Sequence, residues 1–598
     1  MCGIGGFLGL SADNNSAIMA KLLGHRGPDG FGIYEDPKNG LGLIHTRLAI
    51  LDLSNAGRQP MYYGGDAGEK NGRSDRYCLI FNGEIYNYRE LRANLEKDGE
   101  RFESDSDTEV LLRLLFRKGV DALPMLAGMF AFAFWDPFKR RVILARDGLG
   151  IKPLYYSYDG RTLIFASEFR AVEAFLSSRT PDADSIVDFL MWGSFQEPGT
   201  LLQEVRQLRA GHYLEWLDGQ VSVSQWYAPS YKRLESITNP VSQSREALLE
   251  SVKRHLVSDV PVGIFLSGGI DSTAVLCLAR EVLGKNADIR TFSIVFNEAE
   301  YDESATIRKS VEHFQTDHTQ WSMTSEEGAS EIEPYLSAMD LPTTDGFNTW
   351  CVSKLAKQNG VKVVLSGLGG DEMFAGYGTF RRVPQLRSAL RKSCGIGGLL
   401  GRGLAAVTTS PRYLRLASYL KGSGTAVAAY HVMRGFFTES EARKLVEALR
   451  LEDPTPVNWN DPDVNAEEIV GYLEMTRYMR NQLLRDSDVF SMAHGLELRV
   501  PFVDTRLLDS LLSISASSRL RPGKKLLLEA IPEIPIWVRQ QPKRGFRFPF
   551  QEWMSERFGS MLRDADTLSN VPFKLWYRRW AVAALLRGLN RLPGSERP

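Results

Sequence analysis

The stretch "VPVGIFLSGGIDSTAVLCLAREVLG" (260–284) decides the fold class of the second half of the chain. Its apolar start predicts a buried strand, and the run from 272 predicts an amphipathic helix. Small residues join the two, so backbone N–H groups converge in front of the helix, where the helix dipole also favours negative charge. Glycine turns between a strand and a helix also occur without a ligand, so an anion site needs a second observation.

A second stretch, "VVLSGLGGDEMFAGY" (363–377), repeats the pattern of an apolar strand that runs into glycines and acidic residues. Around the two stretches, strands and helices alternate. This alternation predicts an α/β fold with a parallel sheet, which binds ligands beyond the carboxyl ends of its strands. The expected strands are 260–267, 290–296 and 361–367, the expected helices are 272–284, one from about 303, and 347–360, and residues 385–598 are expected to be mostly helical.

The first turn is not a Walker A loop, because it lacks the glycine-lysine pair that reaches the terminal phosphates of a nucleotide. Asp271 stands there instead, and its carboxylate is a hard oxygen ligand suited to magnesium on a pyrophosphate. The turn therefore predicts a pyrophosphate site with a metal ion.

Together, "SGGIDS" (267–272) and "LSGLGGDE" (365–372) closely resemble the ATP-pyrophosphatase fold of the asparagine synthetase and β-lactam synthetase family. Members of that family adenylate a carboxylate and release pyrophosphate, so the resemblance implies ATP as a substrate and Mg²⁺ as a cofactor. It implies that Ser267, Gly268, Gly269, Asp271 and Ser272 hold the pyrophosphate and its magnesium, that Asp371 is a second metal ligand, and that Leu266, Ile294, Ser366 and Gly367 surround the adenosine.

The helical tail carries two more family-like stretches, "DSDVFSMAHGLELRVPFVD" (486–504) and "PKRGFRFP" (542–549). By resemblance, Lys543 stabilises the charge that builds on the phosphates during adenylation, which suits a compact point charge. Glu497 and Arg499 are expected to form a structural ion pair beside the cleft.

The first 225 residues follow another pattern, with short β-like runs separated by Gly, Asn and Asp and helices near 88–99 and 106–119. We expect an α+β sandwich of the αββα type here. The expected domains are residues 2–210, a linker at 211–240, and an α/β parallel-sheet domain with a helical C-terminal part at 241–598.

The chain opens "MCGIGGFLGL", so removal of Met1 would leave Cys2 with both a thiol and a free α-amine. An N-terminal cysteine can hydrolyse glutamine without a separate histidine, because the α-amine can move the proton. Such hydrolysis supplies ammonia, which a carboxylate-activating domain needs to finish an amide.

The other parts of this chemistry stand in "IHTRLAIL" (44–51), "IFNGEIYNY" (80–88) and "SDSDTEV" (104–110). Taken singly, Asn82 with Gly83 is more often a hairpin turn, and an aspartate such as Asp107 is more often a helix cap. Taken jointly they resemble the class II, N-terminal-nucleophile glutamine amidotransferases. The resemblance implies Asn82 and Gly83 as oxyanion donors, Glu84 and Asp107 as partners of the glutamine ammonium, and Arg47 as the clamp on the α-carboxylate.

Composition excludes several other classes. The 598 residues hold 72 Lys and Arg against 73 Asp and Glu, so no overall charge favours nucleic acid or an anionic membrane, and we expect small-molecule substrates. The five cysteines form no close pair and no CxxC, which favours a reducing cytoplasm over a disulfide framework or a zinc site. We expect no exported or membrane-spanning segment. A homodimer is compatible with the sequence, which does not determine the oligomeric state.

The identity of the carboxylate acceptor stays open. Aspartate is the leading choice by family resemblance, but asparagine synthetases that resemble this chain carry a glutamate at the position of Leu368, where it is thought to act as a general base. The segment "MDLPTTDGFNTW" (339–350) also lacks the arginine that some bacterial members offer to the amino acid substrate. The alternatives are a different carboxylate, such as a sugar acid, a peptide or an unusual amino acid, and a catalytically silent ATP-binding relative. A ring-closing synthetase fits less well, because it commonly lacks the cysteine.

Overall fold

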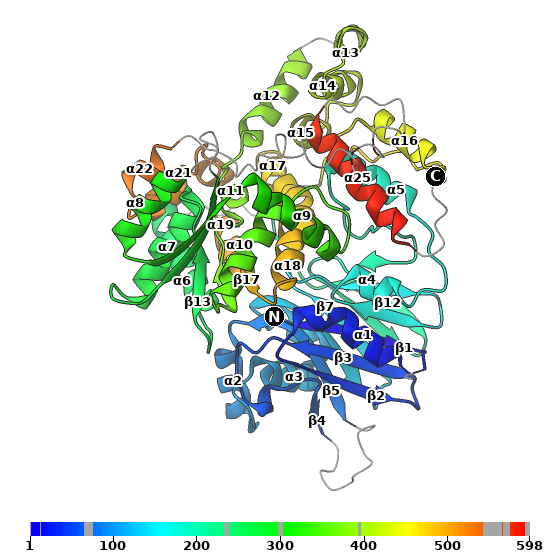
Figure 1. Cartoon of the computed structure of the whole chain (residues 1–598), viewed down its shortest axis with the longest axis vertical. Coiled ribbons are helices and arrows are strands. Elements are labelled where there is room, and N and C mark those ends of the chain that lie inside the picture. The colour runs from blue at the N-terminus through cyan, green and yellow to red at the C-terminus, as the bar shows by residue number, and fades with distance from the viewer. Residues whose placement is uncertain are drawn as a thin grey trace.

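A computed structural model describes residues 2–11, 14–64, 76–231, 239–296, 303–392, 396–541 and 575–592, with the single residues 562, 565 and 568. Two antiparallel sheets form one end of the molecule, and a parallel sheet with many helices forms the other (Figure 1). The predicted change of architecture along the chain is therefore confirmed.

The N-terminal sheets pack face to face. The first has the strand order β10-β8-β9-β1-β3-β2, and the second has the order β12-β11-β7-β6-β5-β4. The first consists of β1 Gly3–Leu8, β2 Gly30–Asp36, β3 Leu41–Arg47, β8 Tyr155–Tyr158, β9 Leu163–Ala166 and β10 Arg206–Gln207. The second consists of β4 Met61–Tyr63, β5 Tyr77–Ile85, β6 Gly128–Asp136, β7 Arg141–Arg146, β11 His212–Leu217 and β12 Gln220–Gln225.

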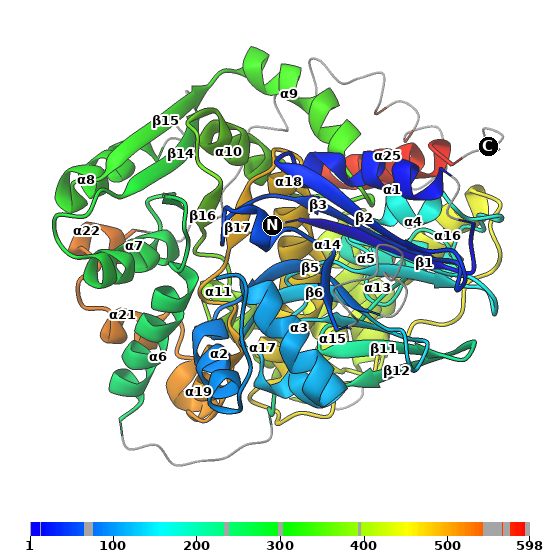
Figure 2. The ribbon, with the colours of Figure 1, turned by 90° about the horizontal axis from the view of Figure 1, so that it is seen from below.

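Both faces of strand β5 are buried, which explains its nearly continuous apolar sequence. Cys78 and Ile80 point into the core between the two sheets, whereas Leu79 and Phe81 pack beneath α2 (Tyr88–Lys97) and α3 (Asp107–Lys118). Helix α1 (Asn15–Leu23) covers the other sheet, as the view from below shows (Figure 2). The predicted αββα sandwich is confirmed.

Residues 212–225 differ from the expectation of a linker that starts at 211. They form the hairpin β11–β12, and β11 pairs with β7 at the edge of the second sheet. The sandwich therefore extends beyond residue 210, because the alternating apolar residues Leu214 and Trp216 complete its core.

The parallel sheet has the order β15-β14-β13-β16-β17. Its central strands β13 and β16 are neighbours, so the two glycine turns that follow them meet at one edge of the sheet. Strand β14 matches its predicted range. The strands are β13 Val262–Phe265, β14 Arg290–Phe296, β15 Asp317–Met323, β16 Val363–Leu365 and β17 Glu497–Arg499, and the flanking helices are α6 Pro240–His255, α7 Ile270–Leu283, α8 Ser304–Phe314, α9 Ser325–Ala338, α10 Phe347–Gln358 and α19 Thr505–Leu512.

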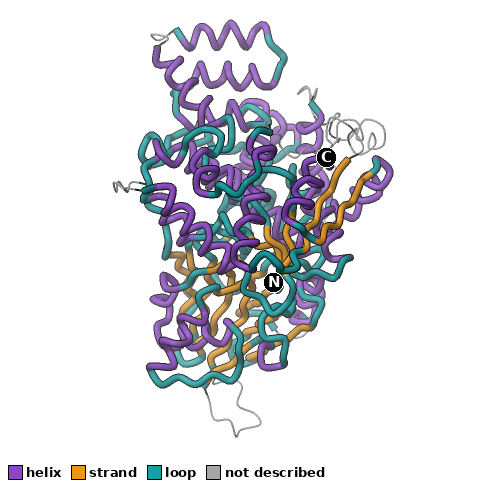
Figure 3. The backbone as a smooth tube through the Cα atoms, turned by 90° about the vertical axis from the view of Figure 1, so that its left-hand side faces the viewer, coloured by secondary structure: helices purple, strands orange, loops and turns teal. Residues whose placement is uncertain are grey.

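Helices make up most of the remaining described chain (Figure 3). They are α11 Gly370–Met373, α12 Thr379–Lys392, α13 Gly397–Val407, α14 Pro411–Lys421, α15 Ala426–Arg434, α16 Glu439–Ala448, α17 Ile469–Leu473, the π-helix η5 Glu474–Leu484, α18 Arg485–Met492, α20 Ala516–Arg519, α21 Lys525–Ala530, α22 Ile536–Arg539 and α25 Trp576–Asn590. None of the helices in these described ranges has the length and apolar character that crossing a bilayer requires.

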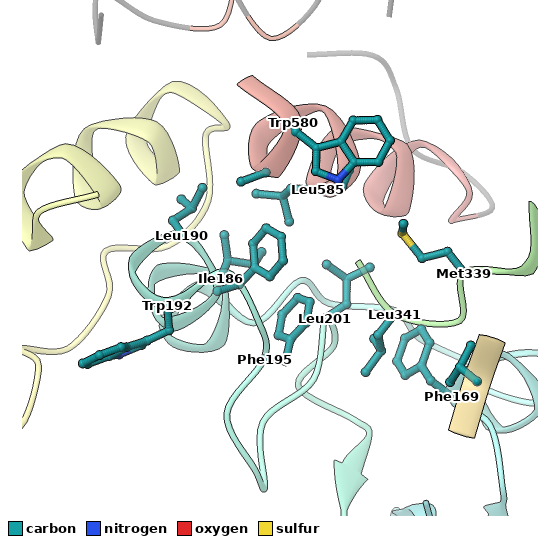
Figure 4. Close-up of a cluster of buried hydrophobic side chains, with 14 of the residues drawn as sticks. Phe169, Ile186, Leu190, Trp192, Phe195, Leu201, Met339, Leu341, Trp580 and Leu585 are labelled. Atoms are coloured by element: carbon teal, nitrogen blue, oxygen red, sulfur yellow. The ribbon is translucent and has the colours of Figure 1, made fainter. Parts of the chain in front are cut away.

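One hydrophobic cluster joins the two halves of the molecule. Ile186 and Leu190, from α5 (Ala183–Trp192), pack with Met339, which follows α9, and with Leu585 of α25 (Figure 4). Phe169, on α4 (Phe169–Glu173), belongs to the same cluster. A continuous apolar core of this kind holds the two halves in one fixed arrangement.

Candidate active sites

Cys2 lies at the start of the central strand β1, where it is 8 % exposed. Its backbone N–H donates to the side-chain oxygen of Asn82 at 3.0 Å, and its Sγ lies 4.0 Å from the carbonyl of Leu48. Burial raises the pKa of the Cys2 thiol. Nucleophilic attack at neutral pH therefore needs a neighbouring proton acceptor.

The structure brings the predicted oxyanion donors to the cysteine. Because the side-chain oxygen of Asn82 accepts from Cys2, its Nδ2 points elsewhere, and this buried nitrogen has no hydrogen-bond partner among the described residues. Such an unmade hydrogen bond is costly unless a ligand completes it. Gly83 follows with φ +151°, and a Cβ there would lie 2.0 Å from the carbonyl of Met129. Only glycine therefore fits beside β6.

The predicted partners of the glutamine ammonium are both buried. Asp107 begins α3 and accepts from the N–H of Ile85 at 2.9 Å, and burial raises its pKa to about 6. Glu84 already has a cationic neighbour, because Arg499 from the other half of the molecule lies 3.2 Å from its carboxylate. The sequence did not predict this contact.

Arg47 ends strand β3, directly after Thr46, which pairs with Gly3. Its guanidinium donates to the carbonyls of Ser54 at 3.0 Å and Asp52 at 2.5 Å. It therefore orders the loop that follows β3, and among the described residues no hydrogen bond joins its side chain to Cys2. Its role as a clamp for the α-carboxylate of glutamine stays a prediction.

The second site is a cavity of about 310 Å³ at the carboxyl ends of β13, β14 and β16. The two glycine turns touch here, since a Cβ on Gly367 would lie 2.7 Å from the backbone of Asp271 and Ser272. Gly268, with φ +71°, and Gly269, the cap of α7, shape the turn without lining the cavity. The other predicted nucleotide contacts line it, namely Leu266, Ser267, Asp271, Ser272, Ile294, Ser366 and Gly367.

The two predicted metal ligands converge on one cation. The ammonium of Lys524 contacts the carboxylate of Asp271 and lies 2.6 Å from that of Asp371. Carboxylates that already share a cation offer the oxygen donors that Mg²⁺ prefers, so they fit the implied metal ion. Sequence reasoning missed Lys524, which stands in "RPGKKLLLE" without a motif to mark it. Lys543 lies outside the described residues.

Further acidic side chains line the cavity. Asp345, Glu372 and Asp486 line it beside Leu368, and no Lys, Arg or His is among its lining residues in the described chain. Burial, reinforced by the charge of Asp371, raises the pKa of Glu372 to about 8, and burial raises that of Asp486 to about 7. The hydroxyl of Tyr377 donates to Glu372 at 2.9 Å.

Two buried arginines connect the sites. Arg26 donates to the carbonyl of Cys2 at 3.3 Å and pairs at 2.6 Å with Asp488, which lies on α18 two residues after the cavity residue Asp486. Arg499 pairs with Glu84 and also with Glu497 at 2.5 Å, which agrees with the predicted ion pair. Arg26 stands in the stretch "HRGPDG" (25–30), which could have marked it as a site residue, but the sequence gives no indication that it pairs with Asp488.

Comparisons with known proteins agree with this geometry. The family model described as asparagine synthase matches residues 243–597, and the model of the glutamine amidotransferase domain matches residues 1–227. The chain belongs to the asparagine synthetase family. It is similar to asparagine synthetase [glutamine-hydrolyzing] 1 of Bacillus subtilis, with 31% identity over 587 residues that cover 94% of this chain and 89% of that protein.

Two other proteins are also similar to this chain. Asparagine synthetase B [glutamine-hydrolyzing] of Escherichia coli is 31% identical over 65% of this chain and 66% of its own length. Amidase chry2 of Gibberella zeae is 26% identical over 96% of this chain and 92% of its own length. This chain is therefore an enzyme of that family, a glutamine-dependent amidotransferase that uses ATP.

Remaining cysteines and histidines fit structural roles. Cys78, Cys277 and Cys351 are buried free thiols, and Cys394 lies outside the described residues. His25 hydrogen-bonds Glu168 at 2.7 Å. The ring of His45 is buried, and this burial lowers its pKa to about 3.

Proposed function

We propose that this enzyme transfers the amide nitrogen of glutamine to a carboxylate that it first converts to an acyl-adenylate. The observation that carries the proposal is the pair of sites in one rigid molecule: Cys2 beside the Asn82 amide nitrogen, which has no hydrogen-bond partner among the described residues, and a cavity lined by the two glycine turns. The products are an amide, glutamate, AMP and pyrophosphate.

At the first site, the Cys2 sulfur attacks the side-chain carbonyl of glutamine, and its proton passes to the α-amine that removal of Met1 would free. The Nδ2 of Asn82 and the N–H of Gly83 donate to the oxyanion as it forms. Asn82 has a second task, because its side-chain oxygen holds the backbone nitrogen of Cys2. Ammonia leaves, and water releases glutamate from the thioester.

At the second site, the acceptor carboxylate attacks the α-phosphorus of ATP, and pyrophosphate leaves. Ser267, which lines the cavity, and the N-terminus of α7 would bind the leaving pyrophosphate. Asp271 and Asp371 would hold Mg²⁺, which when bound neutralises phosphate charge. Lys524, which lies between the two carboxylates, would then be free to turn toward a phosphate oxygen. Ammonia finally displaces AMP from the adenylate.

Aspartate is the first acceptor to test, because two of the relatives named above are called asparagine synthetases. The cavity favours a second candidate, a carboxylic acid other than aspartate. Asp345, Glu372 and Asp486 would face the α-carboxylate of bound aspartate, and Leu368 supplies neither a base nor a charge. Carboxyl oxygens accept hydrogen bonds in either protonation state, so they suit an acceptor whose other polar groups are hydroxyls or ammonium.

Pyrophosphate release with ammonia tests both candidates across aspartate, uronic acids and β-amino acids. Turnover of aspartate at about 1 per second or faster, a common rate for enzymes on their own substrates, would establish aspartate as the acceptor. Turnover only with another acid would establish the second candidate. ADP in place of AMP would contradict the whole proposal, and failure to bind ATP with Mg²⁺ would favour a catalytically silent relative.

A further inference from the structure

Helices α12, α13 and α14 project from the end of the molecule farthest from the N-terminal sheets (Figures 1 and 3). We call them the helical projection. Helices α12 and α14 reach the main core: Val383 of α12 and Tyr419 of α14 belong to the cluster that joins the two halves, and partly buried leucines of both helices pack against it. The outer part, α13 with the start of α14, lies away from both active sites.

The buried face of helix α13 carries small residues. Gly397 and Gly401, one helical turn apart, are buried, and a Cβ on Gly401 would lie 2.7 Å from the carbonyl of Ala417 in α14. The two helices approach so closely because glycine has no side chain. In an ordinary surface hairpin the large apolar residues would occupy this buried face.

The large apolar side chains of α13 face outward instead. Leu399 is 69 % exposed, Leu400 52 % and Val407 83 %, and Ile396 and Tyr413 beside them are each about half exposed. Five of the fifteen exposed large hydrophobic residues in the described chain therefore lie between 396 and 413. A concentration of exposed apolar side chains on one projecting element marks an interaction surface.

The charge of the same region identifies the partner. Between Glu372 and Glu439 the sequence contains ten Lys and Arg and no Asp or Glu. Positive and negative side chains are balanced over the whole chain, but this segment contains only positive ones. The exposed cations of the helical projection are Arg381, Arg382, Arg391, Lys392, Arg402, Arg412 and Lys421.

We propose that the helical projection docks the enzyme on an anionic membrane surface, with Leu399, Leu400 and Val407 inserted among the lipids and the cations at the headgroups. Exposed leucine and valine among lysine and arginine are what binding in the plane of a lipid interface requires. The expectation of no membrane partner rested on the overall charge balance, which hides this separation.

Two other partners fit less well. Nucleic acid would use the cations on phosphates but would gain little from exposed leucine and valine. A second copy of the chain, related by two-fold symmetry, would place this cationic face against itself and incur like-charge repulsion. The proposal does not depend on the identity of the acceptor.

Flotation of the full-length enzyme with vesicles tests the proposal. We expect it to float with an equal mixture of phosphatidylglycerol and phosphatidylcholine and not with phosphatidylcholine alone, and we expect high salt to weaken binding. Replacing Arg381, Arg382 and Arg391 by Ser should lower the partition coefficient about a hundredfold. Leu399→Asp with Leu400→Asp should abolish flotation.

Phe138→Asp is the matched control, because Phe138 is 67 % exposed at the turn between β6 and β7, on another part of the molecule. All these positions face solvent, so glutamine hydrolysis should stay at the wild-type rate and report an intact fold. Equal flotation with both vesicle types, or none with either, would overturn the proposal. A dimer that dissociates when Leu399 and Leu400 become aspartate would overturn it in favour of self-association.

Discussion

The guanidinium of Arg499 lies 3.2 Å from the carboxylate of Glu84, next to the proposed oxyanion donors of the other half of the molecule. It also lies 2.5 Å from Glu497 on its own strand. The backbone carbonyl of Arg499 accepts from the N–H of Ser366, which lines the nucleotide cavity, at 2.9 Å. One buried residue therefore contacts both active sites.

Removing this guanidinium should destabilise the protein strongly. Arg499→Met leaves two buried carboxylates without their shared cation, and breaking a buried ion pair from one side costs about 3–5 kcal/mol. Thermal unfolding should show a clear drop that Glu84→Gln partly reverses in the double variant. Arg245→Met is the control: it removes a partly exposed arginine that pairs with Glu281 and Glu533, and about 1 kcal/mol or less is expected. Equal losses in both variants would refute the central role of Arg499.

The conservative change Arg499→Lys separates positioning from stability. It keeps the charge but loses the planar, forked geometry that binds two carboxylates. We expect a higher KM for glutamine, because Glu84 is less well held, and little change in synthesis supported by ammonia. A rise in the KM for ATP with no change for glutamine would show that Arg499 serves the nucleotide cavity instead.

Cys2→Ala should abolish glutamine hydrolysis and leave ammonia-supported synthesis within a few-fold of wild type, because the two sites use separate residues. Cys78→Ala is the control, since this buried thiol lies between the sheets away from the site. The readouts are glutamate release and pyrophosphate release on the same preparations. Loss of both activities in Cys2→Ala would mean that the cysteine is structural.

Lys524 should compete with Mg²⁺ for Asp271 and Asp371. Lys524→Met should lower the melting temperature, because the carboxylates lose a buried counter-charge, and added Mg²⁺ without ATP should restore more stability in the variant than in wild type. Lys525→Met, one residue further along, is the control. If Mg²⁺ raises the melting temperature of wild type and of Lys524→Met by the same amount, then Lys524 does not compete with the metal ion.

We expect the buried carboxylate of Asp107 to bind glutamine and, when charged, to lower the stability of the fold. Its pKa is raised from 3.8 to about 6 by burial, so its charged form destabilises the fold. Below about pH 4 the group is protonated both folded and unfolded, and no penalty exists. The penalty grows as the pH rises to about 6 and then stays near 3 kcal/mol, at 1.36 kcal/mol per pKa unit.

The variant Asp107→Asn should therefore melt at a higher temperature than wild type. The difference should grow between pH 4 and pH 6 and stay constant above pH 6. It should also lose affinity for glutamine, because the ammonium partner loses its charge. Asp188→Asn is the control, since burial also raises the pKa of Asp188, to about 6, on α5 away from Cys2. Asp188→Asn should become more stable without losing affinity for glutamine. Unchanged glutamine affinity in Asp107→Asn would remove Asp107 from the binding site.

The sequence predicted those parts of the fold that repeat a local pattern. Strand β14 and the start of α10 lie at the positions that the apolar pattern predicted. The rule that ligands bind at the carboxyl ends of parallel strands correctly predicted that Asp271 and Asp371 lie close together. Strand β15 was missed because its sequence "DHTQWSM" is polar at the edge of the sheet. Strand β17 was missed because three residues within helical sequence give no periodic signal.

The contacts that join the two halves could not be predicted. Arg499 meets Glu84, and Arg26 meets Asp488, only after both halves have folded and packed. Lys524 reaches the two aspartates from the start of α21, where no motif marks it. Tertiary packing sets these distances, so a single sequence carries no local trace of them.

The transfer of glutamine nitrogen within the molecule is tested most directly with amide-¹⁵N-glutamine in the presence of unlabelled ammonium, with the best acceptor from the panel. We predict that ¹⁵N enters the product amide, because Cys2 and the nucleotide cavity belong to one rigid molecule, and that one AMP and one pyrophosphate form for each amide, labelled or not. Product amide that contains only unlabelled nitrogen, or ATP cleavage to ADP, would contradict this account.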